Sequence, residues 1–208
     1  LADAADDAAV ADAPAIDARA LDAAVIDAPV DAAVDAATDA PTDACEPTWN
    51  DLLVNPAFDT GVAPWTQSST IIRTAAQMPF APQSPPSAVE FGVTNNADDV
   101  LTQTVTIPAD ATALRLRGWH CDVTTDLTAG SDTFVVTLET PGGAVLETLH
   151  DISNANVGMV CAWETFEWDA LLPHAGETLV LRFHGRTNAG FLTRFVVDSL
   201  ALEALACP

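Results

Sequence analysis

The chain has 208 residues, 30 of them acidic and 7 basic, and its formal net charge is −23. Such an acidic chain is repelled by the phosphates of nucleic acids and by anionic lipids, which argues against nucleic-acid binding and against attachment to membrane surfaces. No apolar run reaches the roughly 20 residues that a membrane-spanning helix needs. The length fits one domain with an additional segment.

Residues 1–44 form a low-complexity segment in which Asp-Ala pairs recur. Asp returns every five residues from Asp12 to Asp27 and every four from Asp31 to Asp43. The four-residue spacing would place like charges one helical turn apart, and three prolines would interrupt a helix. The segment has no aromatic side chain to bury. We therefore predict an acidic, extended stalk or linker.

Asp-Ala-Pro-Val tracts of this kind resemble the spacers that follow the signal or lipid anchor in surface proteins of high-GC Gram-negative bacteria. The resemblance implies an exported chain, located outside the cell or at the cell surface. Because the sequence starts at Leu1 and enters the repeats at once, we expect a processed product.

Composition changes at Cys45, and residues 45–208 have the pattern of an all-β domain. Short alternating runs are separated by turn signals, and no helical period persists. Between two of the runs, ETPGGAVLE predicts a hairpin in which Gly142 and Gly143 supply positive φ angles. The predicted strands, which together indicate a β-sandwich, are residues 51–54, 65–73, 88–93, 100–107, 113–123, 133–140, 145–150, 163–170, 178–185 and 192–204.

The domain resembles jelly-roll carbohydrate-binding modules of the family 4/9-like, galactose-binding-like group. AGETLVLRFHGR and RFVVDSLALEA resemble the last two strands of that group, and VLTQTVTIP and WETFEW fit strands between. The sequence LLVNPAFDTGVAPWT resembles the opening strand and loop, with matches at Asn55, Phe58, Asp59, Gly61 and Trp65. The resemblance spans roughly residues 50–204 and implies a jelly-roll β-sandwich. Pro56 and Ala57 replace a commoner Gly pair, and the chain has no tyrosine to serve as a sugar platform.

The same resemblance implies a structural calcium ion. In that group the ion is commonly held by the acidic residue after the opening Phe and by the acid of the last strand, which are Asp59 and Asp198 here. Carboxylate and carbonyl oxygens are the ligands that calcium prefers. Alternatively, both carboxylates only accept hydrogen bonds from loop amides. We expect the acids of the runs 95–99 and 122–132 to be solvated.

Four cysteines allow two disulfides in three possible pairings. A jelly roll brings its first and last strands together, which favours a bond between Cys45 and Cys207. Cys121 ends one predicted strand and Cys161 precedes another, so antiparallel neighbours would join these two. The alternative, a zinc site that also uses His120, lacks a C-x-x-C pair.

The sequence contains no common catalytic motif, such as G-x-S-x-G, H-E-x-x-H or a phosphate-binding Gly-rich loop. Glycosidases use a pair of carboxylates, for which Glu164 and Glu167 are the candidates, but on one strand their side chains would point to opposite faces. His174 has the surroundings of a turn residue. We therefore predict that the domain is not an enzyme.

Strand alternation places a set of ligand-binding candidates on outward positions. In ALRLRGWHC, inward leucines leave Arg115, Arg117 and Trp119 outside, and in TLVLRFHGR they leave Arg182 and His184 outside. An exposed Trp beside guanidinium donors suits a sugar or an acidic group. Alternatively, a bulge at Gly118 turns Trp119 into the core and the arginines only neutralise acids. Four other aromatic residues are assigned to the core: Phe58, Trp65, Phe166 and Trp168.

Two hypotheses follow. The first is a non-catalytic, disulfide-bonded module that binds a glycan or another extracellular polymer and is displayed on the acidic stalk. The second is a structural subunit of a cell-surface assembly, whose protein partners order residues 1–44. A mobile stalk and an exposed Trp119 favour the first, and stalk residues packed on another chain favour the second.

Overall fold

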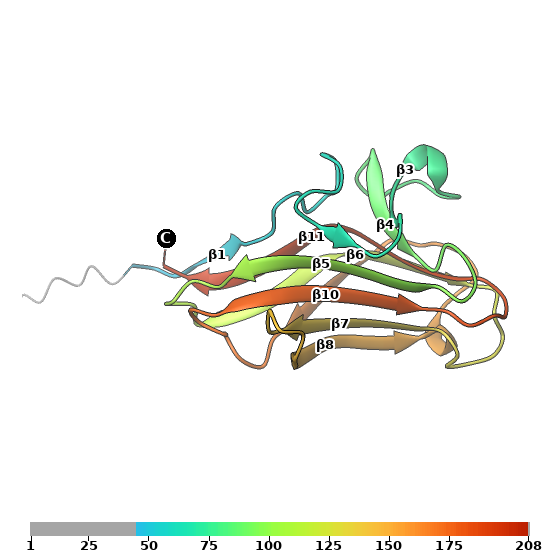
Figure 1. Ribbon diagram of the computed structural model, residues 1–208. Coiled ribbons are helices and arrows are strands. Elements are labelled where there is room, and N and C mark those ends of the chain that lie inside the picture. The colour runs from blue at the N-terminus through green and yellow to red at the C-terminus, as the bar shows by residue number, and fades with distance from the viewer. Residues whose placement is uncertain (1–44, 208) are drawn as a thin grey trace, which may run out of the picture. The chain divides into compact units, whose positions relative to one another are not determined.

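The computed structural model describes residues 45–207, which form a sandwich of two antiparallel β-sheets (Figure 1). The predicted all-β class is confirmed. The predicted stalk, residues 1–44, lies outside the described residues, and so does the packing that distinguishes the two hypotheses. Within residues 45–207, no helix is long and apolar enough to cross a membrane.

Sheet A has the strand order β3-β4-β11-β6-β9, and β1 also pairs with β11. The first half of β11 pairs with β4 and the second half with β1, so β11 lies in the middle of the sheet. The strands of sheet A are β1 (Thr48–Asp51), β3 (Ile72–Thr74), β4 (Ser87–Phe91), β6 (Ala113–Thr124), β9 (Glu164–Asp169) and β11 (Thr193–Ala206).

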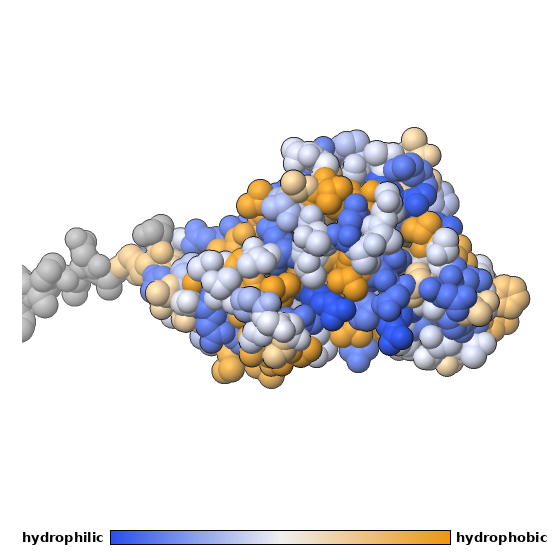
Figure 2. All heavy atoms as spheres, viewed as in Figure 1, coloured by the Kyte–Doolittle hydropathy of each residue, from blue (hydrophilic) through white to orange (hydrophobic). Residues whose placement is uncertain are grey.

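Sheet B has the order β2-β5-β10-β7-β8. Its outer face is turned toward the viewer in Figure 1, and on the same face in Figure 2 apolar side chains are scattered among polar ones. Two short 3₁₀ helices, η1 (Ala75–Gln77) and η2 (Asn154–Asn156), lie in connections. The strands of sheet B are β2 (Thr66–Gln67), β5 (Asp98–Thr106), β7 (Thr133–Glu139), β8 (Val145–Ser153) and β10 (Thr178–Arg186).

Strands β4 to β11 have the topology of a jelly roll. They form the arrays β4-β11-β6-β9 and β5-β10-β7-β8, and between β4 and β11 the chain changes sheet at every connection except the β7–β8 hairpin. Two interlocked Greek keys of this kind define the jelly roll. The fold predicted from the sequence is therefore confirmed.

The core lies between the sheets and is built by alternate residues of the strands. On β10, Leu179, Leu181 and Phe183 are buried while the residues between them are partly exposed. Of the four aromatic residues predicted for the core, three are buried, and Trp168 is partly buried against it. The aromatic side chains that are fully buried between the sheets are Phe58, Phe91, Phe134, Phe183 and Phe195.

Local hydrogen bonds explain where the strands differ from the predicted ranges. The first strand ends at Asp51 because its Oδ1 accepts a hydrogen bond from the amide of Leu53 (3.0 Å), which turns the chain. The predicted strand 65–73 is interrupted, since Gln67 Oε1 accepts the amides of Ile71 and Ile72 (3.1 and 3.0 Å).

The β7–β8 hairpin is confirmed, but its turn is not the predicted one. Gly143 has a positive φ (83°) and Gly142 does not. The amide of Gly143 donates to the carbonyl of Thr140 (2.9 Å), so Pro141 occupies the second position of a four-residue turn. Proline favours that position, and a single left-handed residue after it completes the hairpin.

Both predicted disulfides are present, Cys45–Cys207 and Cys121–Cys161. The first closes the domain beside β1 and the end of β11. The second joins the outward face of β6 to the segment before β9. Because all four cysteines are bonded to one another, the alternative zinc site does not form.

The expectation of solvated acids in two loops is wrong in part. Asp99, Asp126 and Asp132 are buried, with exposed fractions of 6%, 4% and 0%. Asp99 accepts a hydrogen bond from the amide of Gly92 (2.9 Å), and the other two lie in the β6–β7 loop. These carboxylates therefore contribute to the structure of the loops at one end of the sandwich.

Candidate functional site

Trp119 lies on the outer face of sheet A, as alternation along β6 predicts. Gly118, the residue before it, faces the core, where an added Cβ would lie 2.8 Å from Leu200 Cδ2 and from Phe166 Cζ. The predicted alternative of a bulge at Gly118 that turns Trp119 inward is therefore wrong. The pairing irregularity lies on β11, between Asp198 and Ala201.

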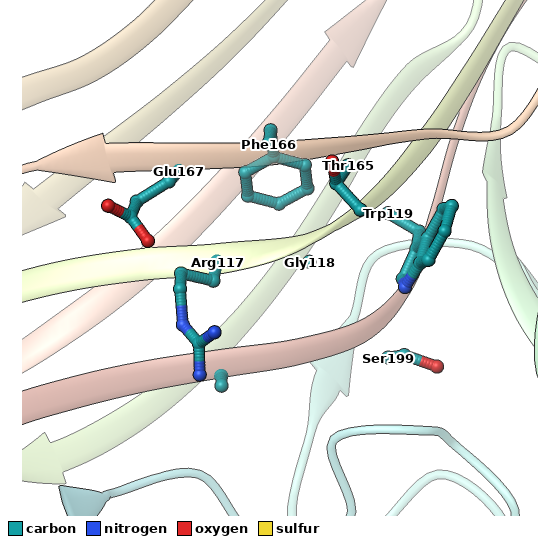
Figure 3. A pocket seen from close by; sticks show the side chains of 8 residues that line it. Arg117, Gly118, Trp119, Thr165, Phe166, Glu167 and Ser199 are labelled. Atoms are coloured by element: carbon teal, nitrogen blue, oxygen red, sulfur yellow. The ribbon is translucent and has the colours of Figure 1, made fainter. Parts of the chain in front are cut away.

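This bulge on β11 helps to form a pocket. Ser199, inside the bulge, has a positive φ of 50°. The pocket has a volume of about 410 Å³ and opens on the outer face of β6, β9 and β11. Figure 3 shows the indole ring of Trp119 on one side of Gly118, and Arg117 and Glu167 on the other. The residues that line the pocket are Arg117, Gly118, Trp119, Thr165, Phe166, Glu167, Ser199 and Ala201.

Arg117 is held in place by Glu203 on β11. Its Nε donates to Glu203 Oε2 (2.9 Å), and its Nη2 donates to Glu203 Oε1. The hydrogen bond to Glu203 raises the pKa of Arg117, so the guanidinium stays charged. The Arg117 side chain is 43% exposed and that of Glu167 is 50% exposed. A fixed donor and a carboxylate acceptor therefore face solvent on the same wall of the pocket.

Arg115 does not line the pocket. Its guanidinium lies over the ring of Trp49 (3.8 Å), and its Nε donates to Glu203 Oε2 (2.8 Å). Its Nη1 lies 3.4 Å from Glu167 Oε2. Arg115 thus orients two carboxylates beside the pocket, and Trp49 covers its other side.

The structure does not bring Arg182 and His184 to this pocket. Both lie on the outer face of β10, in sheet B, where Arg182 Nη1 pairs with Glu139 Oε1 (3.2 Å) and His184 pairs with Asp98. Alternation tells which side of its own strand a residue takes. It does not tell that β6 and β10 belong to opposite sheets, whose outer faces point away from each other.

Several pocket residues were not among the candidates from the sequence. Thr165 and Glu167 lie opposite Trp119 and Arg117 in the β6–β9 pairing. The predicted bond between Cys121 and Cys161 implies that β6 and β9 are neighbours, so their pairing register could have been predicted from the sequence. Ser199 has no such signal, because it reaches the pocket through the bulge.

Asp198, a predicted calcium ligand, is fully buried next to the pocket. Its Oδ2 accepts the amide of Ser84 (2.8 Å) and its Oδ1 that of Ser199 (2.7 Å). Burial raises the pKa of Asp198 to about 6, and the nearby charge of Asp59 adds to the shift. Asp198 also lies directly opposite Trp119 in the β6–β11 pairing.

Other polar residues make contacts that indicate a structural role. Glu164 and Glu167 pair with His120 and Arg117, on opposite faces of β6. His174 is buried in a turn, between carboxylate oxygens of Glu147 (3.4 Å) and Glu177. Within residues 45–207, no group of three or more His, Cys, Asp or Glu side chains is placed to hold a metal ion.

No protein-family model and no curated protein sequence matches the chain. Among solved structures, it is similar to TmCBM61, solved in complex with beta-1,4-galactotriose (TM-score 0.54, 19% identity, 74% of this chain and 97% of that chain). It is also similar to the K3 cleaved adhesin domain of Lys-gingipain from Porphyromonas gingivalis (TM-score 0.51, 17% identity, 75% and 99%).

A third similarity covers only part of a larger enzyme. The enzymatically active domain of tailspike protein 4 from bacteriophage CBA120 has a TM-score of 0.50 and 13% identity over 74% of this chain and 21% of that chain. At such low identities these similarities show the fold alone. The fold of this chain is thus one that occurs in a carbohydrate-binding module, and the narrower resemblance to the family 4/9-like group stays a prediction.

Proposed function

We propose that the described domain is a non-catalytic carbohydrate-binding module and that a glycan binds in the Trp119 pocket. The observation that carries the proposal is the arrangement of one indole ring, one guanidinium and one carboxylate around a pocket of about 410 Å³. The similarity to TmCBM61, which was solved with a galactose trisaccharide, supports it.

Each wall of the pocket suits one part of a sugar. The C–H face of a pyranose stacks on an aromatic ring, which Trp119 provides. Sugar hydroxyls accept hydrogen bonds from Arg117 and donate to Glu167, and Thr165 and Ser199 lie at the rim. Binding at one such site is expected at micromolar to millimolar dissociation constants, about 4–8 kcal/mol.

The place of action is proposed to be outside the cell. Disulfides persist in oxidising compartments, and this domain has two. Together with the predicted stalk, they support display at the surface of a bacterial cell.

Retention on immobilised polysaccharides, including a beta-1,4-galactan, tests the glycan site. Trp119→Ala should abolish retention and leave the melting temperature within a few degrees, because the residue is partly exposed on the outer face of sheet A. Phe191→Ala is the matched control, since Phe191 is an exposed aromatic residue outside the pocket (68% exposed). No retention of the parent chain on any glycan, or equal retention of both variants, would contradict the proposal.

A calcium ion near Asp59 and Asp198 is proposed as a structural ligand. Two features support it: Asp198 is fully buried, and the charge of Asp59 lies near enough to raise the pKa of Asp198 further. When bound, the ion would neutralise Asp198 and connect the loop around Asp59 to β11. A chelator should lower the melting temperature, and Asp198→Ala should remove one bound calcium per chain.

A further inference from the structure

Three connections meet at the end of the sandwich opposite Cys45 and Cys207, where β6 ends and β11 begins (Figure 1). They are the β6–β7 loop, the β10–β11 loop and the segment between β8 and β9 that contains η2. Asn188, in the β10–β11 loop, connects two acids of the β6–β7 loop. Its amide donates to Asp132 Oδ1 (2.7 Å) and its Nδ2 donates to Asp126 Oδ2 (3.0 Å). The amide of Asn154, in η2, donates to the carbonyl of Asp132 (3.1 Å). Two carboxylates and two carboxamides therefore form one cluster.

The Asp132 carboxylate is buried and only partly satisfied. Its residue is 0% exposed, and its Oδ2 is buried without a hydrogen-bond partner. Asp126 is 4% exposed and accepts only from neutral donors, the amide of Thr128 (2.8 Å), Ser131 Oγ (3.2 Å) and Asn188. Within residues 45–207, neither carboxylate forms an ion pair. Buried charge without an opposite charge is costly, which points to a cation.

The carboxamides of Asn154 and Asn188 turn their nitrogens toward oxygens of the cluster, as Asn188 Nδ2 does toward Asp126 Oδ2. The Nδ2 of Asn154 has three oxygens around it, the carbonyls of Thr128 (3.0 Å) and Asp126 (3.5 Å) and Ser131 Oγ (3.5 Å). An amide group has only two N–H donors, so it cannot satisfy three acceptors at full strength. The Oδ1 atoms of Asn154 and Asn188 accept the amides of Asp132 (3.4 Å) and Gly190 (2.5 Å), so both carboxamides act as neutral donors and the charge of the carboxylates stays uncompensated.

We propose that Asp126 and Asp132, together with carbonyl oxygens of the β6–β7 loop, bind a calcium ion that ties the three loops together. Carboxylates, carboxamide oxygens and carbonyls from irregular loops are the ligands that calcium takes, and the cluster has no nitrogen or sulfur ligand that would favour a transition metal. The site shares no residue with the one proposed at Asp59 and Asp198.

The ion has a route from solvent. A second cavity, of about 200 Å³, is lined by Asp126 and Asn154 together with apolar side chains that include Leu127 and Met159. Leu127 and Met159 are 83% and 68% exposed, so the cavity lies at the surface. A cation that orders Asp126 would also fix the position of these exposed apolar residues.

Calcium titration of the chelator-treated full chain tests the proposal, with Asp132→Asn as the variant and Asp151→Asn as the control. Asp151 is an exposed acid on β8, so its variant removes the same charge without touching the cluster. Asp132→Asn should lose one bound calcium per chain, whereas Asp151→Asn and Asp198→Ala should keep the calcium that Asp132→Asn loses.

Melting temperatures give a second readout in case the variant disturbs the loop. Without calcium, Asp132→Asn should melt above the parent chain, because it removes an unpaired buried charge. With saturating calcium it should melt below the parent, because it lacks the ligand. An unchanged calcium count, or a shift of the same sign and size in both conditions, would overturn the proposal.

Discussion

The outer faces of the two sheets share a sequence pattern but have different surfaces in the structure. β6 and β10 both alternate apolar residues with outward arginines. On sheet A, inward Gly118 and the bulge on β11 leave a pocket beside Trp119. On sheet B, no residue of β10 lines that pocket, and Arg182 and His184 pair with acids of neighbouring strands. Because β10 also turns a glycine, Gly185, toward the core, the bulge on β11, more than the arginines or the inward glycine, distinguishes the face that has this pocket.

The arginines on the two faces also differ in how many hydrogen bonds hold them. Glu139, the partner of Arg182, is buried and accepts a second hydrogen bond from Thr137 Oγ1 (3.0 Å). Arg117 is paired as well, but its carboxylate partner Glu203 is shared with Arg115, and its side chain remains 43% exposed. Arg117 is therefore held by two hydrogen bonds with its side chain 43% exposed, whereas Arg182 is held by one with its side chain 31% exposed.

The largest expected difference between the faces is in the pH dependence of the free energy of unfolding, and it comes from Asp198. Its folded-state pKa of about 6 lies above the ordinary 3.8, so the folded chain keeps a proton that the unfolded chain releases. The free energy of unfolding should therefore fall as pH rises from about 4 to 6, by about 3 kcal/mol for this group when a chelator is present. Denaturant unfolding across this pH range measures the effect.

Asp198→Asn isolates that contribution. The variant should lack the fall between pH 4 and 6, so the difference in unfolding free energy between parent and variant should change with pH by about 3 kcal/mol. A difference that is constant with pH would show that Asp198 titrates normally and that its surroundings on sheet A are not as described.

The second expected difference concerns the glycine that each of the two strands turns toward the core, Gly118 on β6 and Gly185 on β10. An added Cβ at Gly185 would lie 2.6 Å from Phe91 Cβ, an atom fixed close to the backbone. At Gly118 it would meet only the ends of two side chains, at 2.8 Å. Gly185→Ala should therefore lower the free energy of unfolding by about 1–3 kcal/mol, and Gly118→Ala by less. Thermal melts of the two variants check the order, and the reverse order would contradict this packing.

Much of the framework could be predicted because it depends on local or periodic signals. Alternation gave the strands, the outward direction of Trp119 and the opposite faces of Glu164 and Glu167. The cysteine positions, placed on a jelly-roll topology, predicted both disulfides. The side of β6 on which Trp119 lies follows from the neighbouring leucines alone.

The features that could not be predicted depend on which distant segments meet. Nothing in the sequence near Ser199 indicates that β11 bulges there, and nothing near Arg182 indicates to which of the two sheets its strand belongs. Asp126 and Asp132 have the composition of a solvated loop, yet contacts with Asn188, far along the chain, bury them. Burial of a polar loop is a tertiary property, and composition alone does not report it.

The smallest expected effects come from replacing one arginine on each face. Arg117→Met should weaken glycan binding several-fold and leave stability nearly unchanged, because Glu203 keeps its hydrogen bond from Arg115 (2.8 Å). Arg182→Met should leave glycan binding unchanged. Isothermal titration with the glycan retained best by the parent chain measures both. Weaker binding by Arg182→Met alone would place the ligand on sheet B.

In the proposed function, the glycan binds on sheet A at the Trp119 pocket. A titration followed by ¹H–¹⁵N correlation spectra tests it most directly, with beta-1,4-galactotriose and the best-retained oligosaccharide as ligands. With the glycan at this pocket, shifts should concentrate on the indole N–H of Trp119 and on the amides of Arg117, Thr165, Glu167 and Ser199. Shifts centred on β10, at Arg182 and His184, with an unmoved Trp119 indole signal would contradict it.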